Sequence, residues 1–103
     1  MFESYEGAVG SFNSEFGTQS IPVWETVTQF TSEENRGYDK KAFKVHEKHG
    51  SQFSTLQRYI NNYGQKSLDF ELEVYQSGLI QAFGMEIAFK AQRCLKPKSM
   101  GTL

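Results

Sequence analysis

The sequence predicts an α/β protein, and three segments carry that prediction. Side chains alternate along residues 11–16 with the period of two that is typical of a strand, with Phe12, Ser14 and Phe16 on one face and Asn13 and Glu15 on the other. Residues 69–95 have apolar side chains at every third or fourth position, which predicts one long helix, and residues 100–103 begin a second short apolar segment. The order strand, helical connection, strand is a βαβ unit. Such a unit needs neighbouring parallel strands, so the sequence predicts a piece of a larger α/β fold that is helix-rich in isolation.

Two further helices are expected between the first strand and the long helix. Ser20 followed by Pro22 is typical of a helix start, since proline fits a first-turn position whose N–H has no partner. Residues 31–41 are polar and charged and include Gly37, which predicts a loop. Residues 52–63 predict a second helix, which Ser51 caps and Gly64 ends, with an apolar stripe formed by Phe53, Leu56, Ile60 and Tyr63.

The long helix has recognisable ends. Ser67 is a candidate N-cap, acidic residues follow it, and Pro97 stops the helix after the basic Arg93 and Lys96. Gly78 and Gly84 lie inside it at a cost of about 1 kcal/mol each relative to alanine, so we expect a neighbour to pack closely against both. The apolar stripe consists of Leu72, Tyr75, Leu79, Phe83, Ile87, Ala91 and Cys94. In the isolated chain we expect the face centred on Leu79, Phe83 and Ile87 to be exposed, because it should cover strands of the larger fold.

Composition narrows the class of protein. The 103 residues suit one modest domain, and 11 basic against 12 acidic residues argue against nucleic acid or anionic lipid as a partner. No apolar run approaches the roughly 20 residues that cross a bilayer, and residues 1–10 do not resemble a signal peptide. Cys94 is the single cysteine, so no disulfide or four-thiolate zinc site is expected within the chain, and no cofactor is expected. The nine Phe, five Tyr and one Trp favour dense core packing over platforms for a sugar.

Three sequence blocks resemble one enzyme family. They are VGSFNSEFGTQSIPVWETV (residues 9–27), HEKHG (46–50) and YQSGLIQAFGMEIAFKAQRCLKPKSMGTL (75–103). In this order and near this spacing they are similar to consecutive blocks of the β-mannosidases of glycoside hydrolase family 2. The resemblance implies that residues 1–103 are a partial catalytic (β/α)8 TIM barrel, truncated at both ends. It would contain strand seven, the helical connection and the start of strand eight.

The same resemblance implies a role for Glu15. In that family the Ser-Glu-Phe/Tyr-Gly element carries the nucleophile of a retaining exo-β-mannosidase, which hydrolyses terminal non-reducing β-D-mannose residues from β-mannosides. By this match Glu15 is the nucleophile, while the acid/base is an Asn-Glu pair outside this chain, so the isolated chain is expected to be inactive. The substrate would be a β-mannoside or oligosaccharide, and the remainder of the barrel would be required. The family is lysosomal in animals and periplasmic, secreted or cytoplasmic in microbes.

Other residues are weaker candidates for the site. Gln19, His46 and His49 are candidates for substrate binding, although structural hydrogen bonding is the favoured interpretation of both histidines. His46 and His49 do not have the spacing of a zinc helix, so no metal is expected. Trp24, in the first turn of a helix, is expected to be a packing anchor.

Two alternatives to a β-mannosidase stay open. The chain is compatible with a segment of another exo-β-glycosidase of family 2, of the β-glucosaminidase or endo-β-mannosidase type. It is also compatible with a catalytically inactive helical interaction module.

Overall fold

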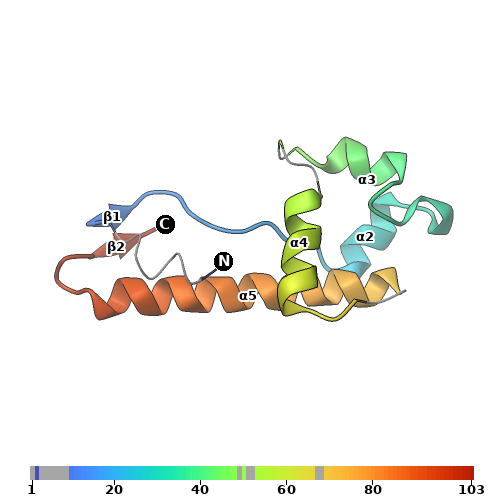
Figure 1. Cartoon of the computed structure of the whole chain (residues 1–103). Helices are drawn as coiled ribbons and strands as arrows, with labels where there is room; N and C mark the ends of the chain where they lie inside the picture. The colour runs from blue at the N-terminus through green and yellow to red at the C-terminus, as the bar shows by residue number, and fades with distance from the viewer. Residues whose placement is uncertain (1, 3–9, 49, 51–52, 67–68) are drawn as a thin grey trace. The chain divides into compact units, whose positions relative to one another are not determined.

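The computed structural model describes residue 2 and residues 10–48, 50, 53–66 and 69–103. Its elements, in chain order, are β1 (Phe12–Asn13), α2 (Trp24–Phe30), the 3-10 helix η1 (Glu33–Asn35), α3 (Lys41–His46), α4 (Ser54–Tyr63), α5 (Phe70–Cys94) and β2 (Gly101–Thr102) (Figure 1). The chain divides into two compact units, each described here by itself. We call Met1–Gln19 with Gln81–Leu103 the strand unit and Ser20–Ile80 the helical unit. Helix α5 contributes to both.

The strand unit contains the two predicted strands and the C-terminal part of α5. Strands β1 and β2 pair in parallel, with Phe12 opposite Gly101 and Asn13 opposite Thr102. Two backbone hydrogen bonds flank the pair, from Met100 N–H to the Ser11 carbonyl at 3.0 Å and from Leu103 N–H to the Asn13 carbonyl at 2.9 Å. The pair lies beside the C-terminal half of α5 (Figure 1). Strand pairing and the helical connection between the strands are therefore confirmed, although each strand is only two residues long.

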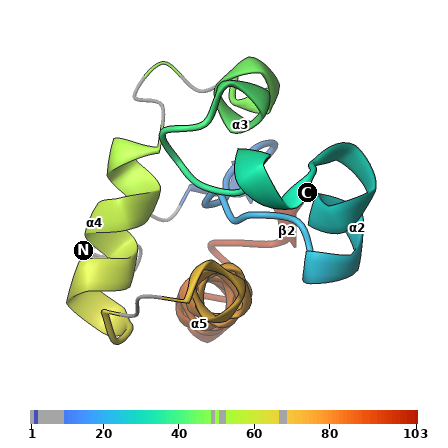
Figure 2. The same cartoon turned by 90° about the vertical axis from the view of Figure 1, so that its right-hand side faces the viewer.

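The helical unit is built around an aromatic cluster. Phe43 is buried, and its ring lies 5.7 Å from that of Phe30, 6.0 Å from that of Phe53 and 5.2 Å from that of Phe70. The Tyr38 ring lies 5.3 Å from Phe53 and 5.1 Å from Phe70. These rings bring α2, α3 and α4 together around the first turns of α5 (Figure 2). The abundant aromatic residues of this unit thus serve core packing, as the composition predicts.

The bounds of α5 agree with the sequence prediction to within one residue at each end. The Asp69 carboxylate accepts a hydrogen bond of 3.0 Å from the backbone N–H of Glu71, which is the contact an N-cap makes. Ser67, the predicted cap, lies outside the described residues. After Cys94 the chain turns through residues 95–98, which include Pro97, as predicted.

Much of the predicted apolar stripe of α5 is exposed, as expected for the isolated chain. Leu72, Tyr75, Leu79 and Phe83 are 45%, 63%, 53% and 45% exposed. The buried positions, also spaced by three or four residues, are Val74, Ser77, Ile80, Gly84 and Ala88. Since α5 carries apolar residues around much of its circumference, two stripes share one period. The stripe with smaller side chains is the covered one because it lets neighbouring segments approach closely.

The two glycines of α5 also differ from each other. A Cβ on Gly84 would lie 2.7 Å from the Phe2 ring, so close packing is confirmed there. A Cβ on Gly78 would meet nothing within 4 Å, so the prediction for this glycine is wrong.

Three local expectations need correction. Helix α2 begins at Trp24, with Val23 as its N-cap, because the chain from Ser20 to Pro22 stays outside the helix and Ile21 is buried with its N–H bonded to Ser77. The predicted loop 31–41 contains η1 and ends in α3, a helix that the sequence analysis missed. Gly37 does adopt a φ of +148°, which suits glycine. Helix α4 begins at Ser54, while Ser51 and Gln52 lie outside the described residues. Gly64 ends α4 as predicted, and its N–H bonds the Ile60 carbonyl.

Candidate functional site

Glu15 follows the end of β1 by two residues and is exposed. Because β1 and β2 run in parallel, their carboxyl ends lie at the same edge of the sheet. Glu15 follows β1 at that edge. This is the edge of an α/β sheet at which binding and catalytic side chains gather. The position that the sequence predicts for Glu15, at the C-terminal end of a strand, is thus confirmed.

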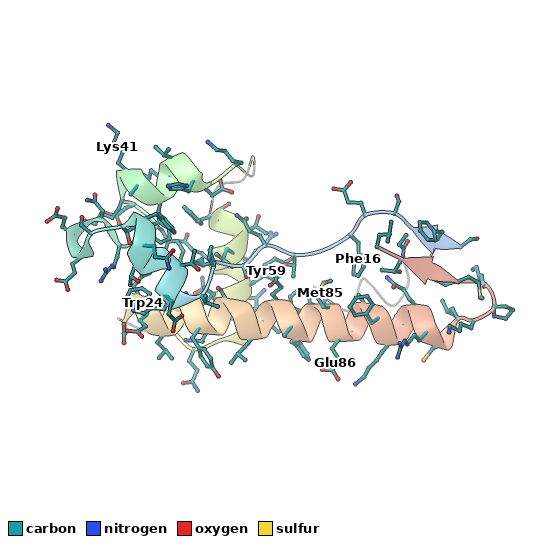
Figure 3. The ribbon with its side chains drawn as sticks, turned by 180° about the vertical axis from the view of Figure 1, so that it is seen from behind. Phe16, Trp24, Lys41, Tyr59, Met85 and Glu86 are labelled. Atoms are coloured by element: carbon teal, nitrogen blue, oxygen red, sulfur yellow. The ribbon has the colours of Figure 1, made fainter. Side chains whose placement is uncertain are left out.

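The backbone on both sides of Glu15 is attached to neighbouring elements. Before it, the Asn13 carbonyl accepts the hydrogen bond from Leu103. After it, the Phe16 ring meets the Phe89 ring of α5 edge to face, with centroids 5.6 Å apart. Figure 3 shows the Phe16 side chain reaching from the segment after β1 toward α5. Two residues further on, the Gln81 side-chain amide donates a 2.7 Å hydrogen bond to the Thr18 carbonyl.

Side chains at the other strand end also meet α5. The Thr102 hydroxyl donates a hydrogen bond to the Gln92 side-chain oxygen at 2.5 Å. A Cβ on Gly101 would lie 2.5 Å from the Phe12 ring, so a larger residue at this position would require the ring to move. Each strand of the pair therefore has a side-chain contact that limits its movement.

The other candidates from the sequence are described within their own units. Gln19 is half-buried in the strand unit, four residues after Glu15. His46 is the last residue of α3 in the helical unit, exposed, with its ring 4.6 Å from that of Phe30. It therefore ends a helix, whereas the resembling family implies a loop, and ring packing is its described contact. His49 lies outside the described residues.

Trp24 is a packing residue, as expected. It is the first residue of α2, and its ring lies 6.4 Å from that of Phe70 in an edge-on arrangement. The Arg36 guanidinium lies 5.2 Å from the centre of the indole ring, within the range of a cation–π contact. Trp24 thus connects α2 to the start of α5 and to the segment after η1.

Two of the pockets that lie within a single unit are lined in part by charged side chains. One of about 580 Å³, in the helical unit, has acidic side chains from Glu25, Asp69 and Glu71 and apolar walls formed by Ile21, Val23, Trp24, Leu72, Val74, Tyr75, Gly78 and Leu79. The other, of about 240 Å³ in the strand unit, is lined by Phe89, Gln92, Arg93, Lys96, Ser99, Met100, Gly101 and Thr102. Glu15 lines neither pocket.

The electrostatics of the described residues single out one group. Burial raises the pKa of the Tyr38 phenol well above its usual value, and the Glu73 carboxylate raises this pKa further.

Within the described ranges, no three His, Cys, Asp or Glu side chains gather closely enough to hold a metal ion. None of the helices described here is long and apolar enough to cross a membrane.

Comparison with solved structures identifies the class of protein that this fold matches, a glycoside hydrolase. Over 99% of its length the chain is similar to the β-D-mannosidase from Dictyoglomus thermophilum, with a TM-score of 0.91 and 30% sequence identity. The resemblance to β-mannosidases that the sequence motifs carry is thereby confirmed. The chain spans 13% of the length of that enzyme. No protein-family model matches the chain. The comparison with curated proteins gives no match either.

The fold is accordingly that of a segment of a larger glycosidase, helix-rich with a small parallel sheet. Gln81, which is bonded to the segment after Glu15, is a residue that the sequence analysis missed. A glutamine on a helix gives no signal in an apolar pattern, and its partner Thr18 lies 63 residues away along the chain. Only the fold brings the two together.

Proposed function

We propose that this chain forms the segment of a retaining exo-β-mannosidase of glycoside hydrolase family 2 that carries the catalytic nucleophile, Glu15. The segment would be one part of a (β/α)8 barrel, containing its seventh strand, the following helical connection and the start of the eighth strand. The observation that carries the proposal is the exposed carboxylate of Glu15 just past β1, in a chain that matches a β-mannosidase over 99% of its length. The strands β1 and β2 pair in parallel and are connected through α5, which supports the barrel assignment.

The chemistry of retention assigns Glu15 a defined step. Its carboxylate would attack the anomeric carbon of the β-mannoside while a second carboxylic acid gives its proton to the leaving oxygen, so that the glycosidic bond breaks and a glycosyl ester forms. A water molecule, deprotonated by the same second group, would then cleave the ester and restore the Glu15 carboxylate. Two such groups stand about 5–5.5 Å apart in retaining enzymes.

The proposal makes a prediction for the isolated chain. In the resembling family the second carboxyl group comes from a segment outside residues 1–103. General acid catalysis contributes about 10²–10⁴-fold, and substrate positioning adds more. We therefore expect the purified chain not to hydrolyse an aryl β-mannoside. Saturable turnover that is lost in Glu15→Gln would contradict this division of roles.

A chimeric enzyme tests the proposal itself. Residues 1–103 would replace the matching segment of the D. thermophilum enzyme, and hydrolysis of an aryl β-mannoside would be measured. We expect Glu15→Ala to lower kcat by several orders of magnitude, because the variant has no nucleophile. Azide should restore part of the activity by attacking from the vacated side, giving the glycosyl azide of inverted configuration.

The control is Glu25→Ala, which removes an exposed carboxylate from the first turn of α2. It should leave kcat nearly unchanged. Near-normal turnover by Glu15→Ala, or an equal loss in Glu25→Ala, would overturn the assignment of Glu15.

A further inference from the structure

The segment that follows Glu15 is attached to α5 by two polar side chains one helical turn apart. In the strand unit, the Gln81 amide donates its 2.7 Å hydrogen bond to the Thr18 carbonyl. In the helical unit, the Ser77 hydroxyl accepts a 3.1 Å hydrogen bond from the N–H of Ile21 and donates one of 2.7 Å to the Val74 carbonyl. Helix α5 thus provides a side-chain donor for the Thr18 carbonyl and a side-chain acceptor for the N–H of Ile21, three residues later.

These contacts meet a need of the backbone in this segment. Between β1 and α2 the chain forms neither strand nor helix, so its peptide groups are bonded outside any helix or sheet ladder. Ser77 is completely buried and Gln81 is half-buried, on a helix whose other fully buried residues are Val74, Ile80, Gly84 and Ala88. A buried polar side chain destabilises the fold unless it is hydrogen-bonded, so its presence on this face indicates a specific partner.

We propose that Gln81 is a positioning residue for Glu15, an inference that rests on the proposed function. Glu15 is exposed, so its own surroundings in the strand unit do not fix its carboxylate by burial. Its placement depends on the backbone, which is held at Asn13 by the bond from Leu103 and at Thr18 by the bond from Gln81. The Phe16–Phe89 contact adds packing between these points. Gln81 therefore fixes the end of the segment that the strand pair does not reach.

Hydrogen exchange of the full 103-residue chain tests the contact without relying on catalysis. Gln81→Glu keeps the shape of the side chain but replaces the N–H donor with an acceptor that opposes the Thr18 carbonyl. Loss of one such bond should make amide exchange in residues 16–20 about tenfold faster, as read by mass spectrometry of peptides. Gln81→Met is the second variant, which removes the bond without adding charge.

The matched control is another glutamine of α5. The Gln76 side chain accepts a hydrogen bond from the Gln65 N–H at 2.6 Å and donates one to the Gln65 carbonyl at 2.9 Å, both within the helical unit. Gln76→Glu should change exchange near residue 65 and leave residues 16–20 as they are. Unchanged exchange of residues 16–20 in both Gln81 variants would overturn the proposal.

The chimeric enzyme supplies the catalytic readout. A misplaced nucleophile slows attack more than substrate binding, so Gln81→Glu should lower kcat about 10- to 100-fold with KM within about twofold of the parent. Gln76→Glu should change neither constant. Faster exchange with an unchanged kcat would show that Gln81 holds the segment without positioning Glu15, and would overturn the inference. Failure of the proposed function would appear separately, as full activity of Glu15→Ala.

Discussion

The helical unit and the strand unit are stabilised in different ways. In the helical unit, the Phe43 ring is 3% exposed and lies among the rings of Phe30, Phe53 and Phe70. In the strand unit, Phe12 on β1 is 58% exposed, and the strand pair relies on backbone hydrogen bonds and a few side-chain contacts with α5. Side-chain packing thus specifies the helical unit, whereas in the strand unit the packing of Phe2 against Gly84 is accompanied by a strand pair that backbone hydrogen bonds hold. The second arrangement suits a segment that presents a carboxylate rather than burying it.

The largest effect is expected from removing the centre of the aromatic cluster. Phe43→Ala should lower the free energy of unfolding by about 3–5 kcal/mol, because it deletes a buried ring and leaves a cavity among its neighbours. Urea denaturation followed by circular dichroism measures the change.

The matched variant in the strand unit is Phe12→Ala. Since that ring is mostly exposed, we expect its loss to cost under about 1 kcal/mol. Equal costs for the two variants would show that the contrast between the units is wrong.

Alanine substitutions at the two glycines of α5 should change the stability of the chain in opposite directions. Gly84→Ala places a methyl group against the Phe2 ring and should destabilise the chain by about 1–3 kcal/mol through overpacking. Gly78→Ala meets open space in a helix interior and should stabilise it by up to about 1 kcal/mol. Thermal unfolding of both variants measures the pair, and a stabilising Gly84→Ala would contradict the close contact with Phe2.

The pH dependence of stability reports on the packing around Tyr38. Its pKa is raised in the folded chain, so above the usual tyrosine pKa of about 10 the unfolded chain loses a proton that the folded chain keeps. Stability from this group is therefore full below about pH 10 and falls by about 1.4 kcal/mol per pH unit above it. Tyr38→Phe should make that fall shallower in urea denaturation at pH 9–11, whereas Tyr75→Phe, at a 63% exposed residue, should not. The same slope in wild type and Tyr38→Phe would argue against burial of the phenol.

The sequence predicts some features of the fold well because local signals determine them. The bounds of α5 follow from the acidic residues at its start and Pro97 after its end, and Gly64 marks the end of α4. The alternation of side chains before Glu15 and the apolar segment at residues 100–103 predict the two strands that pair. The same alternation predicts that Glu15 lies at the end of a strand.

Other features depend on contacts that no local pattern encodes. Helix α3 is six residues long, and its buried Phe43 is covered by rings from other elements. The start of α2 is set by the burial of Ile21 and its bond to Ser77, 56 residues away. The covered face of α5 could not be chosen from periodicity alone, because small and large apolar stripes repeat with the same spacing. The bond between Gln81 and Thr18 escaped prediction for a similar reason.

The most direct test of the central claim is covalent labelling of the nucleophile in the chimeric enzyme. A 2-deoxy-2-fluoro mannosyl donor with a good leaving group should form a slowly hydrolysed ester, since fluorine destabilises the oxocarbenium-like transition states while the leaving group keeps the first step accessible. Peptide mapping should place the added mass in residues 13–19, on Glu15, and Glu15→Gln should take up no label. Labelling of another carboxylate, such as Glu25 or Glu47, would contradict the assignment of Glu15 as the nucleophile.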